Sequence, residues 1–329
     1  MKILVTGGAG FIGSRITEEL VERSYEVRVL DNFDTGSRKN LEGLLARIEL
    51  VEGDLRDLQT VKRAARGTDY IFHHAAIASV PRSIEDPAET NAVNIAGTLN
   101  VLAAAREENV RRVIFASSSS VYGNGGEGMK KEDAPPDPLS PYALSKLAGE
   151  HYCRIFCSLF GLETVVLRYF NVFGPGQSPF SDYAAVIPKF ISLMLEGGQP
   201  VIFGDGNQSR DFVYVRDVVR ANLFAMSAWG AAGRAYNIAC GRSVGLNRIV
   251  ELLNGILGTR IEPAHAAPRP GDVKQSLADI SDAEKFLGYT PGTDFTEGLK
   301  ETVEYFRREL ASKQGRIPTE MPAPFYYGC

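Results

Sequence analysis

The chain has 329 residues, of which 44% are hydrophobic and 23% charged, and its formal net charge at pH 7 is −4. This length allows one large or two modest domains with a buried core. The mild negative charge argues against nucleic-acid binding, which usually needs a basic domain or stripe. No apolar run reaches membrane-spanning length and no signal-peptide layout opens the chain, so we expect a cytoplasmic protein that does not bind membranes.

The first half alternates short apolar strands with amphipathic helices. The expected strands are ILVTG, EVRVLD, RIELVEGD, YIFHHAA, RRVIFASSS and TVVLRYF, and helices are predicted near 11–22, 58–65, 87–108 and 141–160. Strands separated by helices indicate βαβ units, in which a parallel sheet carries helices on both faces. This pattern predicts an α/β fold with a doubly wound parallel sheet over residues 1–170.

The pattern changes beyond residue 170, where proline and glycine become frequent. The remaining strand candidates, such as PVIFGDG and AYNIACG, are short and widely spaced. We expect a smaller mixed lobe over residues 171–312, with segments near 205–240 returning to the first domain, and a tail at 313–329.

A glycine turn follows the first expected strand. In TGGAGFIG, Gly7, Gly10 and Gly13 have the spacing GxxGxxG between a strand and a helix. Glycine permits a tight bend and close approach of the backbone to a pyrophosphate, and the helix N-terminus offers free N–H groups to the anion. In this βαβ context the turn predicts a Rossmann-type dinucleotide site.

Two carboxylates close the next strands. Asp31 ends the second strand and is placed to accept hydrogen bonds from a ribose diol, which favours NAD over NADP because a carboxylate repels a 2′-phosphate. Arg38 is a group that could instead approach such a phosphate. Asp54 ends the third strand, where we expect it to meet the adenine edge.

A tyrosine and a lysine lie one helical turn apart in SPYALSKLAGE. Tyr142 and Lys146 share a helix face because residues four apart are neighbours. A tyrosine has an ordinary pKa near 10, and a nearby ammonium together with the positive nicotinamide ring would lower that pKa toward the range of a general base. A serine from the strand end ASSSSVYG would complete the site.

These motifs together resemble the extended short-chain dehydrogenase/reductases, specifically the NAD-dependent nucleotide-sugar epimerases and dehydratases. The resemblance rests on TGGAGFIG, DNFDTG, GDLRD, HHAA, VYG, YALSK, RYFNVFGP, GDGNQSRDFVYV and RPGD, in one order from residue 2 to about 310. It implies that Ser118, Tyr142 and Lys146 form the catalytic set. It also implies a homodimer, because in related enzymes helices 87–108 and 141–160 pair in a four-helix bundle. The residues expected at the cofactor are Gly7, Gly10, Phe11, Ile12, Gly13, Asp31, Asn32, Asp54, Leu55, Ala75, Asn94, Tyr142 and Lys146.

The residues after Ser118 favour one reaction within this family. Related dehydratases carry Asp-Glu there and decarboxylases that make the pentose carry Ser-Glu, whereas this chain has Ser119 and Ser120. A hydroxyl cannot replace a carboxyl acid in an elimination. After Tyr142 removes the 4-hydroxyl proton and C4 gives a hydride to NAD, the expected outcome is rotation of the 4-keto sugar and hydride return. The prediction is 4-epimerisation.

The resemblance also implies a UDP-sugar site. Asn171, Arg210 and Arg269 would hold the diphosphate, for which guanidinium groups are suited, and Asp272 would hold a ribose diol. Val186 lies in AAVIP, which resembles the segment that lines uracil. The residues expected at the substrate are Ser118, Ser119, Ser120, Tyr142, Asn171, Val186, Arg210, Arg269, Asp272 and Ser276.

The identity of the sugar depends on Ser276. A small residue at this position in related 4-epimerases leaves space for an N-acetyl group, and VPRS at 80–83 resembles the N-acetylhexosamine epimerases. We therefore expect turnover of UDP-GlcNAc and UDP-GalNAc, with UDP-glucose and UDP-galactose as further substrates. The alternatives are a UDP-glucuronate 4-epimerase that uses Arg82 and Ser83, a dehydratase or decarboxylase, and a non-catalytic NAD-binding sensor.

No metal site is expected. The four cysteines, Cys153, Cys157, Cys240 and Cys329, form no CxxC pair, and we interpret them as reduced, packed thiols.

Overall fold

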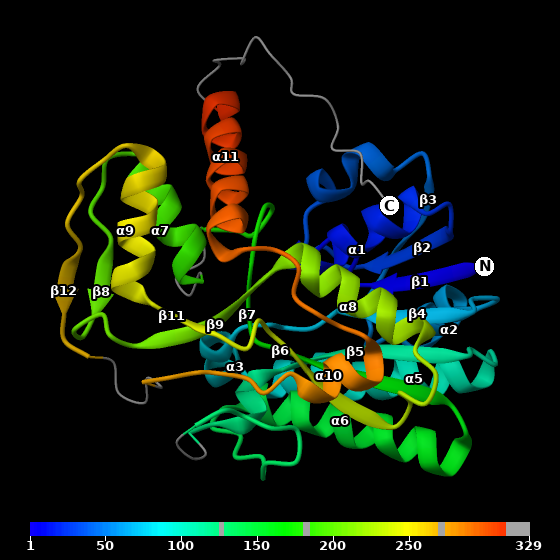
Figure 1. Ribbon diagram of the computed structural model, residues 1–329. Coiled ribbons are helices and arrows are strands. Elements are labelled where there is room, and N and C mark those ends of the chain that lie inside the picture. The colour runs from blue at the N-terminus through cyan, green and yellow to red at the C-terminus, as the bar shows by residue number, and fades with distance from the viewer. Residues whose placement is uncertain (125–127, 180–184, 269–273, 314–329) are drawn as a thin grey trace.

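The computed structural model describes residues 1–124, 128–179, 185–268 and 274–313, and a seven-stranded parallel sheet forms its centre (Figure 1). The strand order is β10-β6-β5-β4-β1-β2-β3. The strands are β1 (Lys2–Thr6), β2 (Glu26–Asp31), β3 (Ile48–Glu52), β4 (Tyr70–His73), β5 (Arg112–Ser118), β6 (Glu163–Tyr169) and β10 (Arg234–Ile238). The chain moves outward from β1 to β3 and then returns to β4 on the other side of β1, which creates a crevice at the carboxyl ends of β1 and β4. The predicted doubly wound α/β fold is confirmed.

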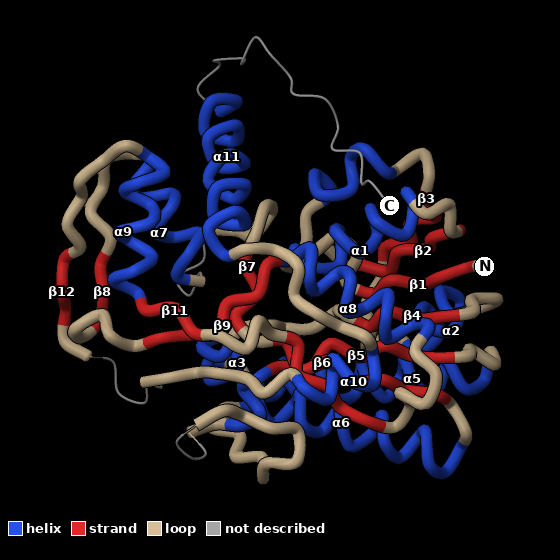
Figure 2. Tube along the Cα trace, in the orientation of Figure 1, coloured by secondary structure: helices blue, strands red, loops and turns tan. Residues whose placement is uncertain are grey.

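Two helical layers cover the sheet (Figure 2). One hydrophobic cluster packs α1 (Phe11–Glu22), α8 (Val215–Ser227) and α10 (Ser281–Leu287) on one face. A second cluster packs α2 (Leu58–Ala65), α5 (Gly97–Glu107) and α6 (Pro141–Phe160) on the other. The strands are buried on both sides, which explains why their sequences are nearly continuous in apolar residues rather than alternating.

A second lobe holds the small sheets. One has the order β11-β9-β7 and the other pairs β12 with β8. Its elements are β7 (Asn171–Phe173), α7 (Val186–Leu195), β8 (Val201–Phe203), β9 (Ser209–Tyr214), β11 (Ser243–Gly245), α9 (Leu246–Leu257), β12 (Ala264–Ala266) and α11 (Phe295–Lys313). The chain leaves β9 directly into α8 and then β10, so residues 215–238 pack with the central sheet. Beyond Lys313, the expected tail lies outside the described residues.

The segment expected as one helix over 87–108 is divided. Helices α3 (Val80–Glu85) and α4 (Pro87–Thr90) precede a π-helical turn at Asn91–Ala96, and α5 follows. In this turn the Asn94 amide bonds to the backbone of Ile77 and to Ser145 Oγ. Apolar periodicity does not distinguish such a turn from regular helix, so this π-helical turn could not be predicted from the sequence.

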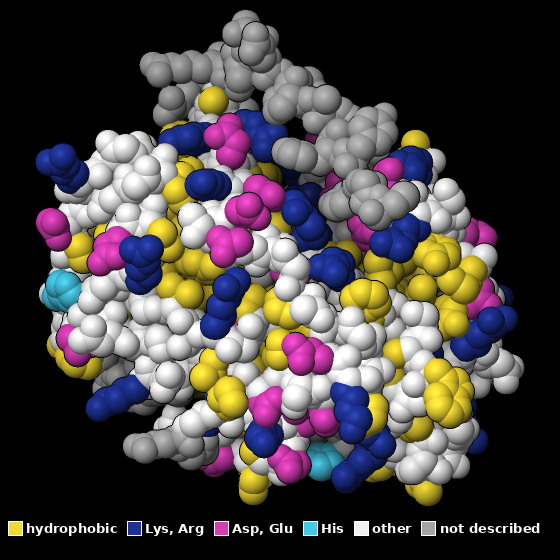
Figure 3. All heavy atoms as spheres, viewed as in Figure 1, with side chains coloured by type: hydrophobic (Ala, Val, Ile, Leu, Met, Phe, Trp, Pro, Cys, Tyr) yellow, Lys and Arg dark blue, Asp and Glu magenta, His cyan; other side chains and the backbone are white. Residues whose placement is uncertain are grey.

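Two further features of the described residues concern the apolar character of the helices and the distribution of surface charge. No helix there is long and apolar enough to cross a membrane. On the face in Figure 3, basic and acidic side chains are interspersed instead of gathering into one basic patch. Two short 3₁₀ segments complete the fold, at Arg38–Leu44 and Ser119–Tyr122.

Candidate active site

A cavity of about 420 Å³ opens at the carboxyl ends of the central strands. This is where doubly wound sheets bind ligands, because the strand order reverses there. The cavity brings together the glycine turn after β1, the loop after β2 and the Tyr–Lys face of α6. Of the residues expected at the cofactor, the cavity is lined by Gly7, Gly10, Phe11, Ile12, Gly13, Asp31, Asn32, Asp54, Leu55, Ala75, Tyr142 and Lys146.

The glycine turn has the shape of an anion cradle. Gly7 has a φ of 70°, and a Cβ atom there would lie 2.6 Å from the Ala75 backbone nitrogen. A Cβ atom on Gly13 would lie 2.1 Å from the Gly7 carbonyl oxygen. No side chain caps the first turn of α1, so its N–H groups are available to an anion. The turn therefore fits the pyrophosphate of a dinucleotide.

Asp31 both supports this turn and faces the cavity. One carboxylate oxygen accepts the Ala9 N–H at 2.9 Å and the other accepts the Phe33 N–H at 2.8 Å. Each carboxylate oxygen can accept two hydrogen bonds, so capacity remains for a ribose diol. Arg38 instead pairs with Glu52 and stacks over Phe33, with 4.5 Å from its guanidinium carbon to the ring centre. This engagement of Arg38 supports the choice of NAD over NADP.

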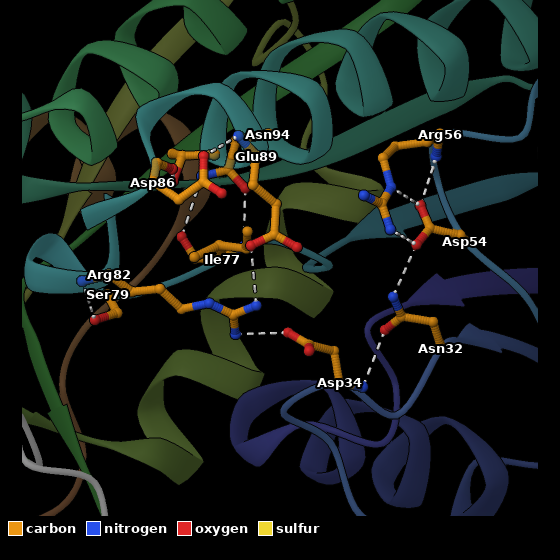
Figure 4. Close-up of polar contacts among 11 residues, drawn as sticks. Asn32, Asp34, Asp54, Arg56, Ile77, Ser79, Arg82, Asp86, Glu89 and Asn94 are labelled. Atoms are coloured by element: carbon orange, nitrogen blue, oxygen red, sulfur yellow. Dashed lines mark hydrogen bonds and ion pairs between the residues drawn. The ribbon is translucent and has the colours of Figure 1, made fainter. Parts of the chain in front are cut away.

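Charged contacts follow the cavity rim from β3 to β2 (Figure 4). Arg56 pairs with Asp54 at 2.7 Å, and Asn32 Nδ2 donates to the same carboxylate at 3.0 Å. The bond from Arg56 lowers the pKa of Asp54 to about 2. Asp54 is therefore a fixed anion at the end of the cavity where we expect the adenine.

The rim continues to α3 and α4. Arg82 pairs with Asp34 at 2.6 Å and with Glu89 at 3.3 Å (Figure 4). Its neighbour Ser83 is buried, donates to the Val80 carbonyl and accepts the Tyr142 N–H. The two residues considered for a glucuronate carboxylate are thus engaged with protein groups.

The catalytic residues expected from the sequence meet where β5 faces α6. Ser118 and Tyr142 are joined by a side-chain hydrogen bond. Lys146 Nζ donates to the Ala116 carbonyl at 2.8 Å and lies 6.0 Å from the centre of the Tyr142 ring. The strand end therefore holds both members of the Tyr–Lys pair.

The electrostatics of this pair differ from the sequence expectation. Burial raises the pKa of Tyr142, and the bond to Ser118 only partly offsets this. Burial also lowers the pKa of Lys146, to about 8. The expectation combined the lysine with the positive nicotinamide ring of the cofactor and did not include burial of the phenol, which favours its neutral form.

Asn94 does not line the cavity among the described residues, although it was expected at the cofactor. Its amide accepts the Ile77 N–H at 2.8 Å and donates to the Ile77 carbonyl and to Ser145 Oγ. Ile77 does line the cavity. The side chain therefore acts behind the cavity wall, which spacing along a helix did not reveal.

The serines after Ser118 begin a 3₁₀ turn. Ser118 Oγ accepts the Ser120 N–H at 3.1 Å and so caps that turn. Ser120 Oγ is buried and has no hydrogen-bond partner among the described residues. Ser119 and Ser120 supply no carboxyl group beside the Tyr–Lys pair.

The residues expected at the substrate fall into two groups: Ser118, Ser119, Ser120 and Tyr142 lie at the end of β5 and on α6, whereas Asn171, Arg210 and Ser276 lie on or against β9 of the second lobe. Arg210 lies on β9, Asn171 Nδ2 donates to the Asp211 carbonyl at 3.2 Å, and the Ser276 N–H donates to the Ser209 carbonyl at 3.0 Å. Val186 begins α7. Arg269 and Asp272 lie outside the described residues.

Asp211 anchors this part of the lobe, although the sequence interpretation assigned it no role. Its buried carboxylate accepts the Cys240 N–H at 2.8 Å and the Ala278 N–H at 3.3 Å. Burial raises its pKa to about 6 in spite of these bonds. The anchor brings the segment after residue 274 alongside β9.

Several cavity residues had no role in the sequence interpretation. His74 Nε2 lies 2.9 Å from the Tyr169 hydroxyl, which also bonds to Asn222. Burial lowers the pKa of His74 to about 3, so its ring is neutral. Ser117 and Ser178 also line the cavity. His74 and Tyr169 both lie at strand ends, and this position could have placed them at the cavity. Their contact with each other could not be predicted, because the two residues are far apart in sequence.

Comparisons with known proteins agree with this geometry. Residues 3–239 match the family model "NAD dependent epimerase/dehydratase family". The UDP-glucose 4-epimerase of Mycolicibacterium smegmatis is 37% identical over 94% of this chain and 99% of that protein.

Two solved structures are similar over nearly the whole chain. One is the UDP-glucose 4-epimerase of Thermotoga maritima with UDP-glucose, with a TM-score of 0.90 and 41% identity over 94% of this chain and 100% of that chain. The other is the UDP-N-acetylglucosamine 4-epimerase of Methanobrevibacter ruminantium M1 in complex with UDP-N-acetylmuramic acid, with a TM-score of 0.90 and 41% identity over 94% and 98%. This chain therefore belongs to the NAD-dependent epimerase/dehydratase family, as an enzyme of the UDP-sugar 4-epimerase type.

Proposed function

We propose that the enzyme interconverts UDP-GlcNAc and UDP-GalNAc at C4, and UDP-glucose and UDP-galactose as further substrates. The observation that carries the reaction type is the strand end: Ser118 bonds to Tyr142, and the next two residues are serines instead of carboxylates. At these two positions a 4-keto sugar would meet hydroxyl groups instead of a carboxyl acid that could expel a leaving group. Hydride return is then the productive route.

The proposed mechanism assigns the proton steps to three residues. Tyr142 removes the 4-hydroxyl proton and later returns it, while Ser118 donates a hydrogen bond to the same oxygen. The Lys146 ammonium favours the phenolate form of Tyr142 as the proton leaves. When bound, NAD supplies the site that accepts the C4 hydride and gives it back.

The proposed UDP site lies in the second lobe. Arg210 and Arg269 would bind the diphosphate, Asn171 and Asp272 would complete the nucleotide contacts, and Ser119 and Ser120 would touch the sugar. Support comes from the position of Asn171 and Arg210 on adjacent strands, where Asn171 pairs with Phe212. We keep 1–170 and 171–312 as the proposed division between cofactor and substrate domains.

The choice of N-acetylhexosamine is supported by Ser276. Its N–H donates to the carbonyl of Ser209, the residue before Arg210, and we propose that this small side chain leaves space for an N-acetyl group that a bulky residue would fill. One similar structure is a UDP-glucose 4-epimerase and the other a UDP-N-acetylglucosamine 4-epimerase, at equal identity. The proposal of an N-acetylhexosamine substrate therefore rests on Ser276 and not on overall similarity.

A panel of UDP-sugars tests the proposal. Purified protein is incubated with UDP-GalNAc, UDP-galactose and UDP-glucuronate, and the epimers are separated by chromatography. We expect conversion of the first two and none of the third, because Arg82 and Ser83 are engaged elsewhere. Conversion of UDP-galactose without UDP-GalNAc would contradict the pocket argument.

We also propose a homodimer through α5 and α6, in the cytoplasm. Four apolar side chains of α6 are between 41% and 72% exposed, namely Leu144, Ile155, Leu159 and Phe160. Exposed apolar side chains along one helix are typical of an association surface. Sedimentation should give a dimer for the wild type and a monomer for Leu159→Glu; a wild-type monomer would contradict the proposal.

A further inference from the structure

Three consecutive residues of β5 are each joined to the same face of α6. Lys146 donates to the Ala116 carbonyl at 2.8 Å, Ser117 Oγ donates to Glu150 Oε1 at 2.5 Å, and Ser118 bonds to Tyr142. The three helix residues, Tyr142, Lys146 and Glu150, share a face because they are four apart. Glu150 is the member of this stripe that the reaction mechanism leaves without a task.

Glu150 is itself held rigidly from β6. Arg168 grips its carboxylate with Nε at 2.9 Å and Nη2 at 2.7 Å, and both side chains are 8% exposed. Arg168 is the register partner of Ser117 in the sheet. Arg168 Nη1 also donates to the Tyr122 hydroxyl at 2.8 Å, which in turn donates to Asn237 on β10. The carboxylate is thus fixed through contacts reaching three adjacent strands.

A buried ion pair of this kind is a weak source of stability. Removing both charges from water costs about as much as their attraction returns, so well-packed apolar residues often stabilise a core equally well. A two-point Arg–carboxylate contact nevertheless fixes the direction of both groups. Its location beside the Tyr–Lys face therefore points to control of geometry.

We propose that Glu150, oriented by Arg168, is a positioning residue for the epimerisation: through Ser117 it holds the end of β5 in register with α6. In this register Ser118 and Tyr142 reach the same substrate oxygen, and Lys146 remains bonded to Ala116. The inference rests on the proposed catalytic roles of Ser118, Tyr142 and Lys146. It predicts that a loosened register lowers the rate of the chemical step more than substrate binding.

The same two strands provide a matched control at their other end. Arg112 begins β5 and pairs with Glu163, which begins β6, at 2.6 Å. Arg112 also donates to the Ala225 carbonyl near the end of α8. This pair joins β5 to β6, whereas the Glu150 pair joins α6 to β6. Among the described residues it makes no hydrogen bond or ion pair with Tyr142 or Lys146, and Glu163 is half-exposed.

The test compares Ser117→Ala and Glu150→Gln with the control Glu163→Gln. For each variant, kcat, KM, the pH dependence of kcat and the unfolding midpoint are measured with UDP-GalNAc. We expect both site variants to lose roughly 10-fold to 100-fold in kcat with KM nearly unchanged, as for a misplaced catalytic group. Glu163→Gln should lower the unfolding midpoint while kcat and its pH dependence stay unchanged.

The pH dependence separates positioning from a merely structural role. The charged or titratable groups facing Lys146 are Tyr142, Glu150 and Cys153 on α6, His73 at the end of β4 and His74 directly after it. Burial keeps both histidines neutral. Glu150 is one of the groups that raise the Lys146 pKa against burial. In Glu150→Gln the basic limb of the kcat profile should therefore move to lower pH, whereas Ser117→Ala should leave it in place.

Three results would overturn the inference. One is unchanged kcat in Ser117→Ala and Glu150→Gln; another is loss of activity only in proportion to loss of folded protein. If Glu150→Gln does not fold, Ser117→Ala alone tests the inference. Full activity of Ser117→Ala is then the third result that would overturn it. Tyr142→Phe serves as a parallel reference: activity in that variant refutes the proposed base, while an inactive Tyr142→Phe beside a fully active Ser117→Ala refutes only the positioning role.

Discussion

The proposed cofactor half of the molecule has seven parallel strands with the cavity at their carboxyl ends, whereas the two small sheets of the proposed substrate lobe consist mainly of three-residue strands. In the first half, the ends of the strands and one face of α6 bring the functional residues to one edge, and buried side chains such as Glu150 tie α6 to the sheet. In the second, side-chain anchors such as Asp211 bring distant segments together. We therefore expect substitutions in the first half to affect mainly the chemical step, and substitutions in the second half to affect mainly substrate binding and the choice of sugar.

The largest effect is expected at the cofactor half, in Tyr142→Phe. This change removes the proton acceptor and keeps the ring, so epimerisation should fall by roughly 10²-fold to 10⁴-fold. Bound NAD, measured after denaturing the purified protein, should remain at the wild-type level because the glycine turn is untouched. Wild-type turnover in this variant would refute the assigned base.

A smaller effect is expected in the lobe, in Arg210→Ala. Loss of a charge-assisted contact to the diphosphate costs about 1.5–3 kcal/mol, which corresponds to a decrease in kcat/KM of roughly 10-fold to 100-fold. NAD retention should not change. Arg248→Ala is the control, since Arg248 is an exposed arginine of α9 paired with Glu251. An equal loss of kcat/KM in Arg210→Ala and Arg248→Ala would contradict the expected difference between the two halves.

The choice of sugar should respond to Ser276→Tyr. A bulky ring beside Ser209 would fill the space proposed for the N-acetyl group. We expect roughly a 10-fold loss in kcat/KM with UDP-GalNAc, as for a steric mismatch of a few atoms, and little change with UDP-galactose. Equal loss with both sugars would show that Ser276 does not discriminate between them.

The smallest effect concerns stability and again involves the cofactor half. The folded pKa of Lys146 is about 8, below its ordinary value of 10.5, because burial disfavours the ammonium. Between these pH values the unfolded chain binds more protons, so stability contributed by this group rises with pH and is lost as pH falls through about 8. Lys146→Met should therefore be stabilised relative to wild type most below pH 8, with a shrinking difference toward pH 10.5 in denaturant unfolding. A difference independent of pH would contradict the buried ammonium.

Sequence reasoning could nominate residues of the cofactor half because the motifs that carry them are local. Gly7, Gly10 and Gly13 lie in one turn, and Tyr142 and Lys146 are one helical turn apart, so motif spacing translates directly into geometry. What it missed there depends on tertiary contacts. Asn94 lies in a π-helical turn, and burial raises the pKa of Tyr142.

In the lobe, sequence reasoning nominated residues without placing them. Ser276 lies beside Ser209 only because residues from distant segments bond to one another, and no periodicity encodes that contact. The pairing of Glu150 with Arg168 is similar, since these residues lie on different elements of the sequence. Such contacts become visible only when the helix packs on the sheet.

The central claim is that the C4 hydride leaves and returns within one bound cofactor, without elimination. UDP-GlcNAc deuterated at C4 is incubated with the enzyme in the presence of excess unlabelled NADH, and the nucleotide-sugar products are analysed by mass spectrometry and NMR. We expect UDP-GalNAc of unchanged mass with the deuterium still at C4. A product that has lost water, or that has lost the label to the unlabelled pool, would contradict it.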